Sequence, residues 1–279
     1  MQAGENTLNL LCARVLLRSL NATGNYDPAD FLREYIDFMT EPDRHNDTYA
    51  ESYHRDFFAN YAKGIPPENC AGAEGHDTAS IGGLVSLPIL IIASLSEGNL
   101  TTTTAQALNH QRLTHRSPSL EIYSIELSAL VFHIFHDTNP NIEELACAAA
   151  SRLGFPAAKV VTSVRSKQSS DCDVIGGLLS SACYIDQSFP SVLYLASRYS
   201  NNFEAALIAN TNVGGDNCHC RRLHRPYNYY ARRRHRLFLP TTATLRTRRI
   251  IVIRSCRCIE RLHDEKPRGE TTCYQECRG

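Results

Sequence analysis

Apolar side chains recur at the three- and four-residue spacing of amphipathic helices through most of the first 210 positions. The clearest case starts at Asp27-Pro28, where a capping side chain precedes a proline at the first helical position. Apolar residues from Phe31 to Met39 then lie on one face. Asp47 is expected to cap the next helix. That helix carries an aromatic stripe that we interpret as core packing: Tyr49, Tyr53, Phe57, Phe58 and Tyr61.

The same spacing continues along the chain. Further helices are expected over residues 84–95, 102–113, 121–135, 140–154, 175–184, 192–197 and 203–208. In the helix 121–135 the apolar positions are Ile122, Ile125, Leu127, Leu130 and Phe132. No stretch alternates apolar and polar residues as a half-buried strand does, and no fixed-length repeat is present. The sequence therefore predicts an all-α domain of roughly ten helices.

This pattern ends at Cys218. Residues 218–279 contain 16 of the 29 basic residues but only 5 of the 29 acidic ones. Arginine clusters neutralise the phosphates of nucleic acids or acidic lipids, and interleaved tyrosines can stack on bases. The alternative is an aberrant terminus, which we favour because the break falls inside a motif and not at a linker. We expect a helical domain over 1–217 and a poorly packed tail over 218–279 that does not bind nucleic acid.

Cysteines of the first 217 residues occur singly, which is typical of small core residues in a reducing compartment. They are Cys12, Cys70, Cys147, Cys172 and Cys183. Arg14 and Arg18 interrupt the apolar run 8–20, so it does not have the pattern of a secretory signal. The run 86–95 is too short to span a bilayer. We expect a soluble intracellular protein, cytoplasmic and without a membrane partner.

Candidate chemistry is concentrated in the segment 210–219, Asn-Thr-Asn-Val-Gly-Gly-Asp-Asn-Cys-His. Gly214-Gly215 allows a tight bend where a side chain would clash. Asp216 follows where a new helix would begin, in a position to hold a cation or cap that helix. Taken alone, a plain turn between helices is the better explanation of this segment. Polar motifs at 4–9, 45–51 and 74–83 change that judgement.

Together the four segments resemble the ADP-ribosylglycohydrolase family, in the family's order along the chain. Segment 210–219 is similar to its late motif, Gly-Gly-Asp-Thr-Asp-Thr. It is more similar to the branch containing selenoprotein J and jellyfish J-type crystallins, which has Gly-Gly-(Asp/Glu)-Asn, then selenocysteine or cysteine, then His. The resemblance implies an all-α fold, an ADP-ribose-type ligand and hydrolysis at the anomeric carbon assisted by a pair of cations such as Mg²⁺.

Carried over residue by residue, the resemblance places the metal ligands at Glu5, Asn6 and Asp216. Asn6 offers only a neutral amide oxygen, and Cys218 stands where the family has a second aspartate. Two of the family's four carboxylates remain, and a thiol is a poor ligand for Mg²⁺. The chain also begins at the early motif, so we expect an incomplete N-terminal part of the domain. Whether the chain is an enzyme is therefore open, and we expect weak or absent hydrolysis.

The segment His76-Asp77-Thr78 resembles the family's substrate loop, in which backbone amides cradle a diphosphate. With Gly214 and Gly215 it makes up the expected substrate-binding set. The residues themselves support an alternative equally well, namely that Asp77 caps a helix beginning near Thr78.

Asp47 and Glu51 lie four positions apart, one turn of the helix expected there. Such a spacing can form a carboxylate pair. We interpret the two as solvated charges on a helix surface, which is the commoner role of such residues.

Cys218 is the candidate reactive group. It follows the Gly-Gly bend at an expected helix start, where the helix dipole favours the thiolate and lowers the thiol pKa. In the selenoprotein J branch this position carries selenocysteine, which implies redox chemistry there. A crystallin-like structural protein or a thiol-redox protein is therefore the alternative function. The tail cysteines have CxC and CxxxC spacings without paired CxxC motifs, so no zinc site is expected.

Overall fold

The computed structural model describes residues 6–45, 49–75, 78–155, 159–160, 163 and 169–215. Within these residues the chain forms ten α-helices and no β-strand, which confirms the predicted all-α fold. The helices are α1 (Leu8–Thr23), α2 (Pro28–Thr40), α3 (Ser52–Tyr61), α4 (Leu87–Ser94), α5 (Leu100–Arg112), α6 (Pro118–His136), α7 (Ile142–Arg152), α9 (Asp171–Asp173), α10 (Ile185–Arg198) and α11 (Phe203–Val213). Short tight turns are η1 (Pro67–Asn69), η2 (Ile81–Leu84) and η3 (Leu95–Glu97), and η4 (Val174–Leu178) is a π-helical turn.

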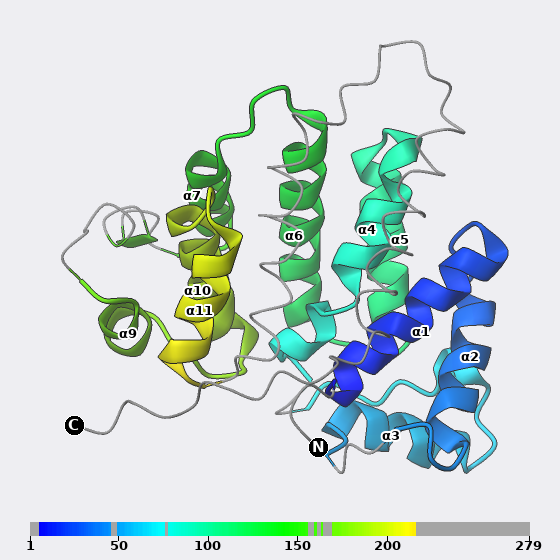
Figure 1. The fold of residues 1–279 in the computed structure, drawn as a ribbon. Helices are drawn as coiled ribbons and strands as arrows, with labels where there is room; N and C mark the ends of the chain where they lie inside the picture. Colours follow the sequence, from blue (N-terminus) through cyan, green and yellow to red (C-terminus); the bar gives the residue numbers. More distant parts are fainter. Residues whose placement is uncertain are drawn as a thin grey trace, which may run out of the picture.

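Helix α6 runs through the middle of the bundle (Figure 1). It packs against α4 and α5 on one side and against α7 and α10 on the other. Helices α1 and α2 form a hairpin, and α1 also contacts α4. At the opposite end α11 lies along α10. The N-terminal and C-terminal helices thus belong to opposite ends of the bundle.

Helix α4 is apolar on every side because it lies between two hydrophobic clusters. Leu90 belongs to the cluster built by α1, α2 and α3. Leu87 and Ile91 belong to the larger cluster formed with α6, α7 and α10. A helix buried on all sides needs no polar face. None of the helices in the described part of the chain is both long and apolar enough to cross a membrane.

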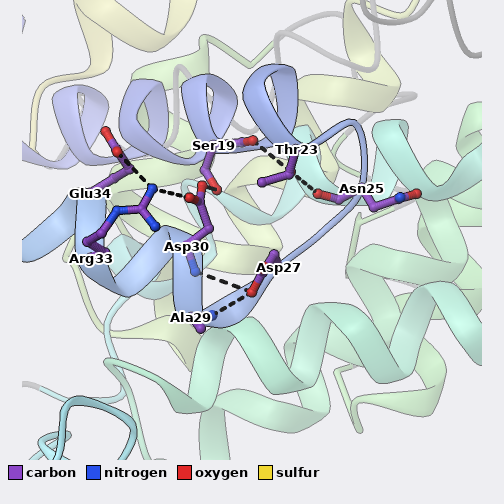
Figure 2. Close-up of polar contacts among 8 residues, drawn as sticks. All are labelled: Ser19, Thr23, Asn25, Asp27, Ala29, Asp30, Arg33 and Glu34. Atoms are coloured by element: carbon purple, nitrogen blue, oxygen red, sulfur yellow. Dashed lines mark hydrogen bonds and ion pairs between the residues drawn. The ribbon is translucent and has the colours of Figure 1, made fainter.

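The turn between α1 and α2 is fixed by polar side chains (Figure 2). The Asp27 carboxylate caps α2 by accepting hydrogen bonds from the backbone N–H groups of Ala29 and Asp30. The buried Asp30 carboxylate accepts a 2.6 Å hydrogen bond from the Ser19 hydroxyl on α1 and also pairs with Arg33. These contacts fix the spacing of the two helices that precede the candidate site.

Helix α3 starts later than the sequence predicts. It begins at Ser52 with Glu51 in the N-cap position, and the predicted cap Asp47 lies outside the described residues. Tyr49 lies outside the helix with 68% of its surface exposed, and Tyr61 is also exposed. Tyr53 and Phe57 are buried as the aromatic stripe predicts. Glu51 is therefore not a charge on a helix surface, because it precedes the first helical residue.

Two further expectations are corrected. The helix predicted over 175–184 is replaced by α9 and η4, and the chain leaves helical structure at Leu179. The pair Gly176-Gly177 explains the early end, since glycine is a poor helix former. Ile122 and Ile125 on α6 are 54% and 43% exposed, although their spacing suggested core positions.

Candidate functional site

The loop before η2 is joined to the segment before α10 by backbone hydrogen bonds. Ser80 and Tyr184 form an isolated antiparallel bridge. The Ile81 N–H donates to the Cys183 carbonyl at 2.9 Å, and the Ile185 N–H donates to the Ala79 carbonyl at 3.0 Å. The motif 74–83 is thereby fixed to a part of the chain 100 positions later, which motif analysis did not include.

The Gly-Gly bend of the late motif packs onto the same later segment. Gly214 ends α11 with φ 80° and ψ −169°, a backbone conformation that only glycine adopts readily. An ideal Cβ on Gly215 would lie 2.4 Å from the Cβ atom of Ser181 and 2.4 Å from its carbonyl oxygen. Ser181 lies three positions before the bridge residue Tyr184. The bend therefore needs glycine for both its conformation and its close approach to Ser181.

Glu51 joins two more segments at this place. Its carboxylate accepts a hydrogen bond from the Asn9 side-chain amide in the first turn of α1. The Ser80 hydroxyl donates to its second oxygen at 3.4 Å. An ideal Cβ on Gly82 would lie 2.8 Å from that second oxygen. Glu51 thus contacts both the helix that follows the early motif and the loop that carries the motif 74–83.

The loop ahead of Ser80 is a tight turn closed by Thr78. The Gly75 N–H donates to the Thr78 hydroxyl at 2.9 Å, and the Thr78 N–H donates to the Gly75 carbonyl at 3.2 Å. Thr78 is buried. The Ser117 hydroxyl, which also caps α6, donates to the Glu74 carboxylate at 2.5 Å. Thr78 therefore holds the turn through its two hydrogen bonds with Gly75.

The structure describes only part of the residue set predicted from the motifs. Asn6, Thr78, Gly214 and Gly215 lie within the described residues. Glu5, His76, Asp77, Asp216 and Cys218 lie outside them. Asn6 is half-buried two positions before the start of α1. The ranges that the structure describes contain no group of three or more His, Cys, Asp or Glu side chains able to hold a metal ion.

A small cavity of about 30 Å³ is lined in part by Asn9 and Gly82. Three histidines line it, His54, His110 and His115. The Tyr35 hydroxyl lies 2.6 Å from Nδ1 of His54. Nε2 of His54 and Nδ1 of His110 are buried and make no hydrogen bond within the described part of the chain. The volume is sufficient for a water molecule, which is the usual partner of such atoms.

Burial keeps two of these histidines neutral. Loss of solvation, followed by the charge of the neighbouring His115, lowers the pKa of His54 to about 3. The same two causes, in the same order, lower the pKa of His110 to about 3. At physiological pH, His54 and His110 in the cavity next to the site are therefore neutral.

A wider depression of about 470 Å³ lies at the turn between α5 and α6. Arg112 and Arg116 line it, together with Glu68 and Glu121. Arg112 is occupied by a two-pronged pair with Glu121 at 2.7 and 2.6 Å. Arg116 donates to the Glu68 carbonyl at 3.2 Å. Both guanidinium groups are thus engaged in contacts between neighbouring segments of the protein.

Motif analysis included Glu51 and Asn9 in its segments but gave neither residue a role in the site. Glu51 closes one of the motif segments, 45–51, and this was the available signal for it. Its contacts come from residues 42 positions earlier and 29 positions later, which no local pattern reveals. Three motifs nevertheless meet through Asn9, Glu51 and Ser80, and the late motif is joined to the loop 79–81 through the segment 181–185.

Comparison with known families gives a match over most of the chain. The model of the ADP-ribosylglycohydrolase family matches residues 2–220, a range that includes all four motif segments. The chain belongs to the ADP-ribosylglycohydrolase family. An ADP-ribosylglycohydrolase-like hydrolase function follows for the domain at this coarse level. No curated protein matches the chain.

Proposed function

We propose that this ADP-ribosylglycohydrolase-like domain binds an ADP-ribose-type ligand where its four motif segments meet, and that its hydrolytic turnover is weak or absent. Two sets of contacts support the location: Glu51 joins Asn9 and Ser80, and the segment 181–185 joins Ser80, through Tyr184, to Gly215, through Ser181. These contacts gather segments from both ends of the domain around one point. An extended ligand with several hydroxyl groups and a diphosphate requires such a composite site.

The expected ligand contacts follow from the chemistry of each segment. By the family resemblance, backbone N–H groups of His76, Asp77 and Gly214-Gly215 would bind the diphosphate, because turns with free amides bind anions, while Thr78 would hold the turn. Hydrolysis would replace the bond between the ribose anomeric carbon and the leaving group by a bond to a water oxygen. A side chain at the site must accept the proton of that water, and a side chain must donate a proton to the leaving group.

The donor set fits a two-cation centre poorly. Glu5 and Asp216 are carboxylates, but Asn6 offers a neutral oxygen and Cys218 a thiol. Mg²⁺ prefers several anionic oxygen ligands, and a thiol does not replace one. When bound, Mg²⁺ would supply charge stabilisation of the leaving group and water. With half of the anionic ligands replaced, we expect little binding of Mg²⁺ and correspondingly little turnover.

The selenoprotein J and crystallin branch supplies the second proposal, favoured by the sequence Gly-Gly-Asp-Asn-Cys-His at 214–219. In that case the domain is a structural or thiol-redox protein in which Cys218 is the reactive group. The two proposals differ in one measurable respect, since only the hydrolase requires Asp216 and a divalent cation.

The test is release of ADP-ribose from an ADP-ribosylated protein in the presence of Mg²⁺. We expect little or no release by the full chain, and loss of any residual release in Asp216→Ala. Rapid release that Asp216→Ala abolishes would contradict weak turnover. Release by the chain with Asn6→Asp and Cys218→Asp together, where the parent chain shows none, would confirm that the missing carboxylates limit the activity.

A further inference from the structure

Glu51 contacts two of the four motif-bearing segments at once. Its first oxygen accepts from the Asn9 amide on α1, and its second lies 3.4 Å from the Ser80 hydroxyl. Gly82 lies against the second oxygen, since an ideal Cβ there would lie only 2.8 Å away. The carboxylate is half-buried, so it is not simply a solvated surface charge. It therefore acts as a fixed link between α1 and the loop 79–82.

The Asn9 side of this link is itself held rigidly. The Tyr53 hydroxyl donates to the Asn9 side-chain carbonyl at 3.1 Å, so both ends of the amide are used. The Tyr53 ring packs against His54 and His115, with ring centroids 4.0 and 3.8 Å apart. All of these side chains except Glu51 are buried. The amide therefore has one orientation, and its N–H₂ group points to Glu51.

We propose that Glu51 is a positioning residue for ligand binding, which sets the distance between the early-motif end of α1 and the loop 79–82. This inference rests on the proposed function, because it assumes that the ligand is held between these segments. Glu51 lies outside the expected metal and substrate set, so it acts through Asn9 and Ser80. A displacement of about 1 Å between two such segments is enough to weaken binding strongly.

The test exchanges the donor and acceptor of the Asn9–Glu51 hydrogen bond. Asn9→Asp places two carboxylates against each other and should weaken ADP-ribose binding about tenfold, since hydrogen bonds to charged groups are the stronger class. Adding Glu51→Gln restores the bond in reverse, because the introduced amide donates to the introduced carboxylate. The double variant should return to within about threefold of the parent dissociation constant. Isothermal titration calorimetry with ADP-ribose measures both.

Glu126→Gln is the matched control, because Glu126 is a buried carboxylate that joins α6 to Arg152 of α7 at 2.8 Å. It should lower the melting temperature and leave the dissociation constant within about twofold. If Asn9→Asp lowers the melting temperature as Glu126→Gln does but leaves ADP-ribose affinity unchanged, Glu51 is only structural and the inference is wrong. Failure of the double variant to recover affinity would also overturn it.

If the parent chain does not bind ADP-ribose, the proposed function fails separately. Amide hydrogen exchange then tests the positioning role without a ligand. Exchange at residues 79–84 should accelerate in Asn9→Asp, return toward the parent rate in the double variant, and remain unchanged in Glu126→Gln. Equal exchange in all four proteins would show that Glu51 does not fix this loop.

Discussion

Gly215 lies so close to Ser181 that no side chain fits between them. An ideal Cβ at Gly215 would lie 2.4 Å from both the Cβ atom and the carbonyl oxygen of Ser181. Ser181 belongs to the segment that pairs with the loop before η2. This contact joins the late motif to the segment 181–185, so a side chain at Gly215 should displace that segment and the loop 79–81 paired with it.

Gly215→Ala should therefore destabilise the domain by about 2–4 kcal/mol, from overpacking together with an alanine at φ 77°. Gly24→Ala is the control for the conformational part, because Gly24 has φ 73° and nothing within 4 Å of an added Cβ. It should cost about 1 kcal/mol. Urea denaturation measures both. Equal losses in the two variants would show that the contact with Ser181 contributes nothing.

The buried histidines predict a loss of stability in mild acid. Loss of solvation lowers the pKa of both His54 and His110 to about 3, so only the unfolded chain takes up their protons between pH 6.5 and 3. Stability is then complete above the unfolded pKa near 6.5 and falls as the pH decreases. The expected slope is about 1.4 kcal/mol per pH unit for each histidine. Denaturation at pH 7.5, 6.5 and 5.5 measures it before most carboxylates titrate.

His54→Gln should reduce this slope by about half, because one of the two titrating groups is removed. His133→Gln is the control, since the His133 side chain is 44% exposed on α6. A slope that is the same in the parent chain and in His54→Gln would mean that His54 is not held neutral by the fold.

Ser19→Ala tests the polar contact shown in Figure 2. It removes a 2.6 Å hydrogen bond to the buried Asp30 carboxylate, which leaves that charge less well satisfied. The expected cost is about 1–3 kcal/mol. Ser119→Ala on the exposed face of α6 should stay within about 0.5 kcal/mol. A cost no larger than that of the control would show that Arg33 alone satisfies Asp30.

Thiol reactivity separates the expected role of Cys218 from that of the described cysteines. Burial, followed by the nearby Glu68 carboxylate, raises the pKa of Cys70, and its thiol donates to the Ile65 carbonyl at 3.2 Å. Cys172 is exposed, which makes it the main competitor. With substoichiometric iodoacetamide we expect mass mapping to find the adduct at Cys218. Modification of Cys172 with Cys218 untouched would remove the support for a redox role.

Local pattern was sufficient for most of the helices but not for their ends. The Asp27-Pro28 start of α2 was predicted because capping and proline geometry are local. The sequence pattern placed the start of α3 too early. Glu51 precedes the helix and instead forms hydrogen bonds with Asn9 and Ser80, which are distant in sequence. The exposure of Ile122 and Ile125 was missed because helical spacing does not show which face has a packing partner.

The sequence was sufficient to identify the segments that form the candidate site, but not the contacts between them. The motif residues Gly214 and Gly215 and the turn residue Thr78 were identified from sequence, and the structure gives each a definite backbone role. The expected ligands Glu5 and Asp216 remain predictions, because they lie outside the described residues. Glu51 was taken for a solvated charge, since burial by distant segments leaves no local mark.

The most direct test of the account is where ADP-ribose contacts the protein. Titration of the isotope-labelled full chain, followed by amide NMR, should shift resonances of residues 6–9, 78–83, 181–185 and 214–215 together. These ranges are far apart in sequence and are joined by the contacts of Glu51 and of the segment 181–185. Shifts confined to the depression around Arg112 and Arg116, or no shifts at saturating ADP-ribose, would contradict it.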